Sequence, residues 1–420
     1  MLLLLLACQL GNFDDTGDAV VEADTDADAD TDADSDADSD ADTDADTDPQ
    51  TDFDVFEGML DGSVALDSGF VTVAQSGGWP IEHDGAYVFA TPAQGTTLLA
   101  GDHNDWTPTA TGTDNGIAWA SVAISEPAGS RYKWVHDAEY RADPNARAYT
   151  FDENGEMSYV RGPRGHLERW PGVAGQGIGA RTVRVWVPVD AVTHQIYVHD
   201  GQSLFHPDAP WGGWHLQGSL GSATMAVGID NTSDRFDDYT AWTDTLDGTT
   251  YGGNGTAYAD YVLDTVRPLV EGEYGKAGKV GVLGSSLGGL IALTIVLEQP
   301  ADWDYAASMS GTVGWGSIEL NNDTVMERYI AEGFFGVPIY LDSGGNAGSG
   351  CVDSDSDGID DDSPDAYDNY CQNRQMADAL GSNGWTWDTD LWHWHEADAQ
   401  HNEGSWAGRV YRPVQIFEAL

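Results

Sequence analysis

The chain is short of positive charge. Lys and Arg total 17 among 420 residues, against 71 Asp and Glu, and the formal net charge is −54 at pH 7. A surface with this balance repels the phosphates of nucleic acids and the head groups of anionic lipids. We therefore expect no nucleic-acid partner and no basic surface that attracts a membrane.

A long apolar run is also missing. The apolar start MLLLLLA is far too short to span a bilayer as a helix. It ends in Leu5-Leu6-Ala7-Cys8, which resembles a bacterial lipobox with Cys8 as the lipid-modified residue, although no Lys or Arg precedes it. Residues 1–8 are therefore predicted to be a lipoprotein-type signal, truncated at its start. The expected location is the bacterial cell envelope, lipid-anchored at the outer surface through Cys8, or the exterior after secretion; the cytosol is the alternative.

Cysteine is scarce, with three residues in the chain. If Cys8 carries the lipid, Cys351 and Cys371 remain as an even pair, which an oxidising compartment would join as one disulfide. Two unrelated free thiols are the alternative.

The N-terminal part of the chain is dominated by aspartate. From Asp14 to Asp54 nearly every second residue is Asp, and neither face of this alternation is apolar enough to bury. Like charges two residues apart repel each other, so residues 9–57 are predicted to form an extended, disordered linker.

Two folded domains are predicted after the linker. Residues 62–163 contain short alternating apolar segments, the first being SGFVTVAQ at 68–75, bounded by turn residues at spacings near ten. This pattern is typical of an immunoglobulin-like β-sandwich. From residue 170 to 420, strand-like and helix-like segments alternate, which predicts an α/β domain with a mainly parallel sheet covered by helices.

Within the first domain, three segments resemble the starch- and glycogen-binding modules. They are Ala100–Trp106, Tyr132–Val135 and Ala142–Asn145. The resemblance implies three sugar-contact residues, Trp106, Lys133 and Tyr140. The alternative is that Trp106 belongs to the core and that the domain only packs against its neighbour.

The most specific motif of the second domain is Gly284-Ser285-Ser286-Leu287-Gly288. It follows the apolar run at 280–283 and precedes an apolar helical stretch. G-x-S-x-G between a strand and a helix is the nucleophile elbow of the α/β-hydrolase fold, in which the turn is too tight for side chains at the two glycines. Ser286 is therefore the candidate nucleophile, and a helix-capping serine is the alternative.

A serine nucleophile needs a base within hydrogen-bond reach, and in this fold the histidine comes last in the chain. His393, His395 and His401 follow Ser286. His393 and His395 alternate with tryptophans in a strand pattern, whereas His401 lies in a loop before the final helix. Because the base must reach the elbow from a loop at the carboxyl edge of the sheet, His401 is the candidate.

Residues 170–420 resemble the esterase family of α/β-hydrolases that includes enterochelin esterases, feruloyl esterases and mycolyltransferases. The matching segments are 198–202, 228–231, 261–274 and 284–289, together with His401, Glu403 and Trp406. The resemblance implies ester hydrolysis through an acyl-serine intermediate on Ser286, with His401 as base. It also implies an oxyanion hole formed by backbone N–H groups, that of Leu287 and one near Gly201 and Gln202.

The triad acid stays open between two residues. In the family it follows a strand of the type IYLDSG, here 339–344, but no carboxylate stands at 345–347. An insertion at 351–371 interrupts the pattern there, and Asp368 keeps the spacing to the helix that resumes near Asn373. Asp368 is preferred because an insertion can move the acid along the sequence while leaving it fixed in space; Asp342 is the alternative.

The insertion at 351–371 has a metal-binding pattern of its own. D-x-D-x-D-G-x-x-D is formed in order by Asp353, Asp355, Asp357, Gly358, Ile359 and Asp361. The pattern resembles thrombospondin-type and dockerin-type calcium repeats, which implies a structural calcium held by these four carboxylates and the Ile359 carbonyl. A solvated acidic loop is the alternative. No cofactor is expected for catalysis.

These features predict an exported serine esterase acting on a carbohydrate-linked or aromatic acyl ester. The alternatives are a siderophore esterase of the enterochelin type, since such enzymes also carry a sandwich before the hydrolase domain, and an acyltransferase. From another class, the alternative is a cell-surface glycan-binding protein on a hydrolase scaffold. The sequence leaves the oligomeric state open.

Overall fold

The computed structural model describes residues 50–346, 350–361 and 368–420. The predicted signal with Cys8 and most of the predicted linker lie outside these ranges. The prediction of a linker up to residue 57 is wrong at its end, because helix α2 (Asp52–Asp61) begins at the last aspartates of the repeat. Thr51 caps this helix in a capping box with Asp54. The alternation gives way to apolar residues at helical spacing, and Phe56 and Met59 are buried.

A second helix, α3 (Leu66–Gln75), occupies the segment for which the sequence predicted the first strand. Phe70, Val73 and Ala74 fit helical spacing as well as they fit a short alternation, and all three are buried. They share one core cluster with Phe56 and Met59 of α2. The helix is favoured because only this conformation turns all three side chains towards α2 and the sheet beneath.

Two sheets follow these helices in the N-terminal part. The four-stranded antiparallel sheet has the order β1 (Ile81–His83), β2 (Ala86–Pro92), β6 (Ile117–Val122), β5 (Gly112–Asp114). The facing strands are β3 (Thr97–Gly101), β4 (Thr109–Ala110), β7 (Arg131–His136), β8 (Glu139–Arg141), β9 (Ala148–Asp152) and β10 (Gly155–Tyr159). Phe89, Leu99 and Trp134 lie in the core between the sheets, while α2 and α3 cover the other face of the four-stranded sheet. That helical layer was not predicted, and the immunoglobulin-like type of this region stays a prediction.

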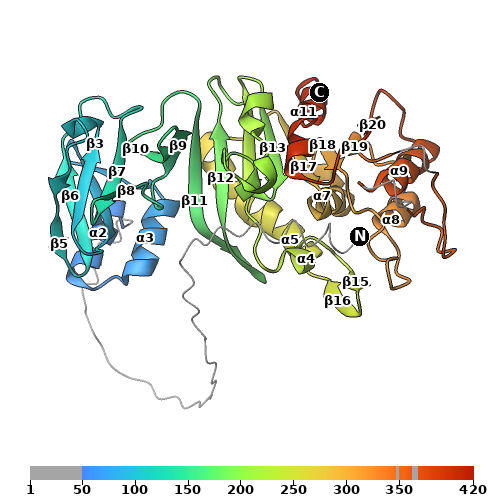
Figure 1. Ribbon diagram of the computed structural model, residues 1–420, viewed down its shortest axis with the longest axis horizontal. Helices are drawn as coiled ribbons and strands as arrows, with labels where there is room; N and C mark the ends of the chain where they lie inside the picture. Colours follow the sequence, from blue (N-terminus) through green and yellow to red (C-terminus); the bar gives the residue numbers. More distant parts are fainter. Residues whose placement is uncertain (1–49, 347–349, 362–367) are drawn as a thin grey trace, which may run out of the picture.

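The strands facing that sheet belong to the same large sheet as the C-terminal half of the chain (Figure 1). β11 (His166–Gly175) pairs with β9 at Leu167 and Glu168, and along its length with β12 (Ile178–Val187). Backbone hydrogen bonds therefore cross the predicted domain boundary at 163–170. The two parts of the chain are joined by a continuous sheet rather than by a flexible connection.

The C-terminal half contains the predicted mainly parallel sheet. After β12 the strand order is β14 (Thr224–Ile229), β13 (His194–His199), β17 (Lys279–Ser285), β18 (Tyr305–Met309), β19 (Ile339–Ser343), β20 (Leu391–His395). Every pair from β14 to β20 is parallel, whereas β12 is antiparallel to both of its neighbours. The helices of this half are α4 (Arg235–Asp238), α5 (Gly255–Tyr261), α6 (Arg267–Tyr274), α7 (Leu287–Glu298), α8 (Val325–Glu332), α9 (Tyr370–Ser382), α10 (Glu403–Ala407) and α11 (Tyr411–Glu418).

Both faces of the parallel sheet are buried. In β13, Tyr197 belongs to the core that includes residues of α5, α7, α8 and α9, whereas its neighbours Ile196 and Val198 belong to the core under α11. Burial on both faces explains why these strands read as continuous apolar runs rather than as alternations. It also leaves the carboxyl edge of the sheet as the place where loops can gather polar side chains.

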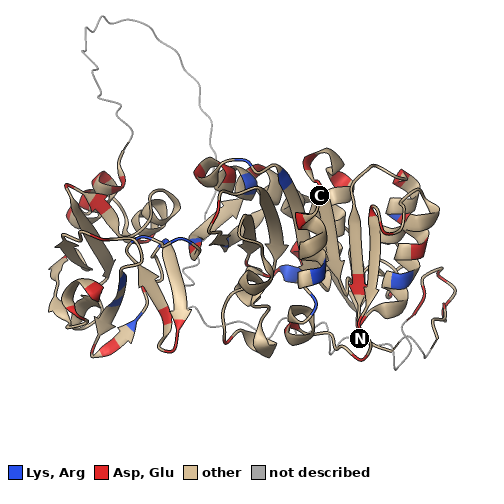
Figure 2. Ribbon diagram, turned by 90° about the horizontal axis from the view of Figure 1, so that it is seen from above, with Lys and Arg blue, Asp and Glu red and all other residues tan. Residues whose placement is uncertain are grey.

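Lys and Arg positions are few and scattered along the fold (Figure 2), and several of these side chains form ion pairs. Arg181 with Asp238, Arg235 with Asp200, and Arg409 with Asp342 and Asp368 are buried pairs. Within the described ranges, no helix combines the length and apolarity needed to cross a bilayer.

Arg169 of β11 binds the two parts of the molecule together. It is buried and forms an ion pair with Glu156 of β10. It also donates hydrogen bonds to the carbonyl groups of Asp143 and Ala146 and lies over the ring of Tyr149.

Replacing Arg169 with Met should lower the free energy of unfolding by about 3–5 kcal/mol, because the change leaves a half-buried carboxylate and two carbonyl groups without their donor. Urea denaturation followed by circular dichroism measures the difference. Arg141→Met is the matched control, since Arg141 forms an exposed ion pair with Glu139, and it should cost less than about 1 kcal/mol. Equal effects of the two substitutions would contradict this role of Arg169.

Candidate active site

Ser286 lies at a sharp turn between β17 and α7. Its φ of 57° and ψ of −126° are unusual for a residue with a side chain. A Cβ atom added at Gly284 would overlap the backbone of Gly288, and one added at Gly289 would lie 2.5 Å from the Ser308 hydroxyl. Close approach of the backbone therefore requires glycine at 284, the Ser308 hydroxyl leaves no room for a side chain at 289, and the strand, turn and helix predicted around Ser286 are present.

Three residues predicted as a group lie in one line of hydrogen bonds. His401 Nε2 is 2.8 Å from Ser286 Oγ, and His401 Nδ1 is 2.8 Å from Asp368 Oδ1. All three side chains are buried. With its Nδ1–H donating to the carboxylate, the imidazole presents the Nε2 lone pair to the serine hydroxyl, which is the arrangement that a general base needs.

Asp368 reaches His401 from the segment that leads into α9. A Cβ atom at Gly344, just after β19, would overlap the Asp368 carboxylate and lie 2.5 Å from the Ala399 carbonyl oxygen. The side chain of the next residue, Asn369, donates hydrogen bonds to the carbonyl groups of Ser310 and Gly311. The missing side chain at 344 and the anchored asparagine together fix the acid beside the histidine.

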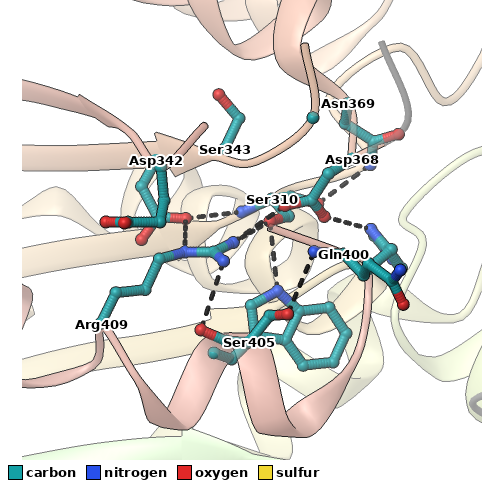
Figure 3. A network of polar contacts seen from close by, with 12 residues as sticks. Ser310, Asp342, Ser343, Asp368, Asn369, Gln400, Ser405 and Arg409 are labelled. Atoms are coloured by element: carbon teal, nitrogen blue, oxygen red, sulfur yellow. Dashed lines mark hydrogen bonds and ion pairs between the residues drawn. The ribbon is translucent and has the colours of Figure 1, made fainter. Parts of the chain in front are cut away.

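Arg409 fixes the same carboxylate from its other side (Figure 3). Its Nη2 donates to Asp368 Oδ2 over 3.0 Å, its Nε donates to Asp342 Oδ1 over 3.1 Å, and it also contacts the Ser310 hydroxyl. The Trp406 indole donates to that hydroxyl as well. The sequence reasoning missed Arg409, because its position between α10 and α11 becomes meaningful only when the two acids are known to meet there.

Asp342, the alternative acid, lies at the end of β19 and is engaged elsewhere. Its carboxylate accepts hydrogen bonds from Arg409, the Ser310 N–H group and the Tyr340 hydroxyl. Burial raises the pKa of Asp342 to about 6; Arg409 opposes this rise, and the charge of Asp368 adds to it. The structure thus places Asp368 against His401, and Asp342 behind Arg409.

Two turns bring backbone N–H groups near Ser286. Leu287 is the first residue of α7 and Gly201 is the first residue of the 3-10 turn η2 (Gly201–Ser203), so neither N–H group has an acceptor within its own helix. Asp200, in the left-handed region before Gly201, is held by two hydrogen bonds of 2.8 Å from Arg235. A Cβ atom at Gly288 would lie 3.2 Å from the Asp200 carboxylate and 3.3 Å from His199 Cβ, so the end of β13 and the residue that precedes Gly201 lie beside the elbow.

The predicted disulfide between Cys351 and Cys371 is present. Within the insertion, Asp353, Asp355 and Asp357 each bring one carboxylate oxygen within 4.8 Å of the others. Oxygen ligands at about 2.4 Å from one Ca²⁺ lie at most about 4.8 Å apart, so these hard donors fit the ion. Asp361 is not in this group, and its carboxylate accepts hydrogen bonds from the N–H and hydroxyl groups of Ser354.

Ile359, the predicted carbonyl ligand, has its side chain buried in the main core. The neighbouring backbone is tied to α9, since the Gln375 side chain accepts from the Asp360 N–H group and donates to the Gly358 carbonyl group. The insertion is therefore attached to α9 through a disulfide, an amide side chain and an apolar side chain.

The candidate sugar-contact residues divide into two groups. Tyr140 is exposed, and its hydroxyl donates to the Trp106 carbonyl group. The Trp106 indole N–H group donates to Asp102. Lys133 is buried instead, and its amino group donates to the Asn154 carbonyl group. Trp106 and Tyr140 therefore remain surface candidates, whereas Lys133 has a structural role.

Comparison with known proteins identifies a matching family model, one curated relative and several solved structures of low sequence identity. The family model described as "Putative esterase" matches residues 179–412. The uncharacterized protein YbbA of Bacillus subtilis is 30% identical over 125 residues, which are 28% of this chain and 49% of that protein. The chain thus spans about half the length of the curated relative that it matches.

Among solved structures, the siderophore hydrolase EstA from Aspergillus nidulans is 17% identical, with a TM-score of 0.46, covering 60% of this chain and 94% of that one. The ferric enterobactin esterase from Salmonella typhimurium is 15% identical, with a TM-score of 0.43, covering 80% and 95% of the two chains.

Asp368 contacts His401, whereas Asp342 does not, so substitution of each acid should affect the reactivity of Ser286 differently. Asp368→Asn should lower the rate at which a fluorophosphonate labels Ser286 by about a thousandfold or more, because the carboxylate that orients His401 is lost. Asp342→Asn should change that rate by less than about tenfold, because Asp342 contacts Arg409 and not His401. Stopped-flow or gel-based labelling of the two purified variants measures both rates. A larger loss in Asp342→Asn would overturn the assignment.

Proposed function

The chain belongs to the Putative esterase family, and we propose that it hydrolyses carboxylic esters through an acyl-serine intermediate on Ser286. One observation carries this proposal: the unbroken line of hydrogen bonds from Ser286 through His401 to Asp368, 2.8 Å at each step. A hydroxyl paired with an oriented imidazole is the arrangement that makes serine a nucleophile at neutral pH.

In the proposed reaction, Ser286 Oγ attacks the ester carbonyl carbon while His401 Nε2 takes its proton. The tetrahedral intermediate collapses when His401 returns that proton to the leaving alcohol, and an acyl ester remains on Ser286. Water then attacks this ester with the same base, which releases the carboxylic acid. Asp368 stays ionised throughout and stabilises the imidazolium, and Arg409 holds Asp368 in place.

The negative charge of each tetrahedral intermediate needs donors that are already in position. We assign this role to the N–H group of Leu287 and to one N–H group of the Gly201–Gln202 segment. Both belong to turns whose first N–H groups lack intrahelical acceptors. Removing one such donor typically lowers the rate by a hundredfold or more.

For the substrate, we propose an ester of a carbohydrate or of an aromatic acid, met outside the cytosol. The disulfide between Cys351 and Cys371 supports an oxidising compartment. Exposed aromatic side chains such as Trp211 and Tyr140 are suited to stacking on sugar or phenyl rings.

Activity and labelling together test the esterase proposal. The purified protein should hydrolyse short-chain nitrophenyl or feruloyl esters and should be labelled by a fluorophosphonate at Ser286, and Ser286→Ala should lose both properties. A panel that adds acylated sugars and a ferric tricatecholate ester ranks the substrate classes by kcat/KM. Preference for the tricatecholate would favour a siderophore esterase. Absence of turnover and labelling in the wild type, with retained glycan binding in Ser286→Ala, would favour a binding protein.

We further propose that Asp353, Asp355 and Asp357 hold a calcium ion that stabilises the insertion. The insertion is fastened to α9, and Asp368 lies two residues before the start of that helix. Neutralising three close carboxylates removes their mutual repulsion, so the bound ion would stabilise the loop next to the triad acid.

Removal of calcium by EGTA should therefore lower both the melting temperature and the esterase rate, and added Ca²⁺ should restore them. Calorimetry and turnover assays measure the two effects, and isothermal titration measures the binding itself. Asp355→Asn should show a weakened response to the ion. Asp388→Asn, which changes a carboxylate outside the insertion, should respond like the wild type. Identical behaviour with and without calcium would contradict this site.

A further inference from the structure

Glu403 is a buried carboxyl group that the proposed mechanism leaves unused. It is the first residue of α10, two positions after His401, and only 7% of its surface is exposed. Among the residues that the structure describes, none donates a hydrogen bond to Glu403 Oε2. A buried carboxyl oxygen without a donor is costly, so its retention points to a donor that arrives with a ligand.

The charged surroundings of Glu403 include the base His401 and Asp200, which directly precedes Gly201. Burial raises the pKa of Glu403, its own backbone N–H group lowers it, the charge of Asp200 raises it, and Arg235 and His401 lower it. Asp200 directly precedes Gly201 and lies against Gly288 of the elbow. The carboxyl group of Glu403 therefore lies within electrostatic reach of both His401 and the segment that holds the oxyanion.

Position beside His401 identifies the half of the ester that Glu403 would meet. In the first half of the reaction the imidazole hands its proton to the leaving alcohol oxygen, so groups next to the imidazole border the alcohol rather than the acyl chain.

An exposed aromatic side chain lies near the same helix. α10 packs against the 3-10 turn η3 (Pro210–Gly212), where a Cβ atom at Gly404 would lie 3.3 Å from the Trp211 carbonyl oxygen. Trp211 has a φ of 59° and is 61% exposed. Residues held in rarely adopted backbone conformations cluster at functional sites, and an exposed indole offers an apolar face on which a ligand can stack.

We propose that Glu403 is a specificity-determining residue that accepts a hydrogen bond from a hydroxyl group on the alcohol half of the substrate. This inference rests on the proposed esterase function and adds the class of alcohol, a polyol or sugar. Such an alcohol combines hydroxyl donors for Glu403 with apolar C–H faces that can lie on the indole of Trp211.

Two esters that share one acyl group test this inference. Butyryl esters of glycerol and of 1-propanol differ only in the hydroxyl groups of the alcohol. The wild type should have the higher kcat/KM on the glyceryl ester. Glu403→Met should lower the ratio of the two kcat/KM values by about ten- to a hundredfold, the range for a buried hydrogen bond to a charged group. Glu403→Gln, which keeps an acceptor oxygen, should lower it less and guards against a folding defect in the Met variant.

The controls separate this inference from the proposed function. Glu332→Gln changes an exposed glutamate and should leave the ratio as in the wild type. Equal losses on both esters in the Glu403 variants would overturn the inference, since they would indicate that Glu403 only positions α10 and His401. A wild type without preference between the two esters would also overturn it. Failure of the esterase proposal appears instead as absent turnover and labelling at Ser286 in the wild type.

Discussion

The ion pair between Arg409 and Asp368 is the interaction on which the site depends. Asp368 is buried, and a buried carboxylate persists in its charged form only where donors replace the water that it has lost. His401 supplies one donor and Arg409 supplies another. Arg409 also contacts Asp342, so one guanidinium group balances two buried acids in a region where a single unpaired charge would destabilise the fold.

This arrangement explains how an insertion is tolerated next to the carboxylate that contacts His401. The chain leaves the sheet after β19, makes the disulfide-closed excursion that ends at Cys371, and delivers Asp368 where α9 begins. The acid is positioned by Gly344 and Arg409, which lie outside the insertion, and by its neighbour Asn369, whose side chain is anchored to Ser310 and Gly311. The loop from Asp353 to Asp361 acts on the acid indirectly, because a disulfide and the Gln375 side chain attach the insertion to α9, at whose start the acid lies.

Sequence patterns predicted the structure correctly where neighbouring residues in the chain determine the conformation. The elbow around Ser286 was predictable because glycine spacing and flanking apolar runs reflect close approach of the backbone. The prediction was wrong at α3. The spacing of its apolar residues fits both a strand and a helix, and packing against α2 favours the helix. Lys133, which the family resemblance suggested as a sugar contact, is buried, and its amino group donates to the carbonyl group of Asn154. The sequence suggested a domain boundary near 163–170, whereas β9 and β11 pair across it in one sheet. Amino-acid composition does not reveal such strand pairing.

The sequence by itself determined the mainly parallel sheet, the turn at Ser286, the choice of His401 as its partner and the pairing of Cys351 with Cys371. Each of these follows from residues close together in the chain, from their order or from a simple count. Only the tertiary structure decided that Asp368 is the aspartate that contacts His401 and that Arg409 holds this carboxylate. It also decided that Glu403 is buried and that, among the described residues, its Oε2 atom has no hydrogen-bond donor. The first two of these facts join residues 33 and 41 positions apart, His401 with Asp368 and Arg409 with Asp368. Such pairings depend on how the strands and helices pack, and no local pattern of residue types records them.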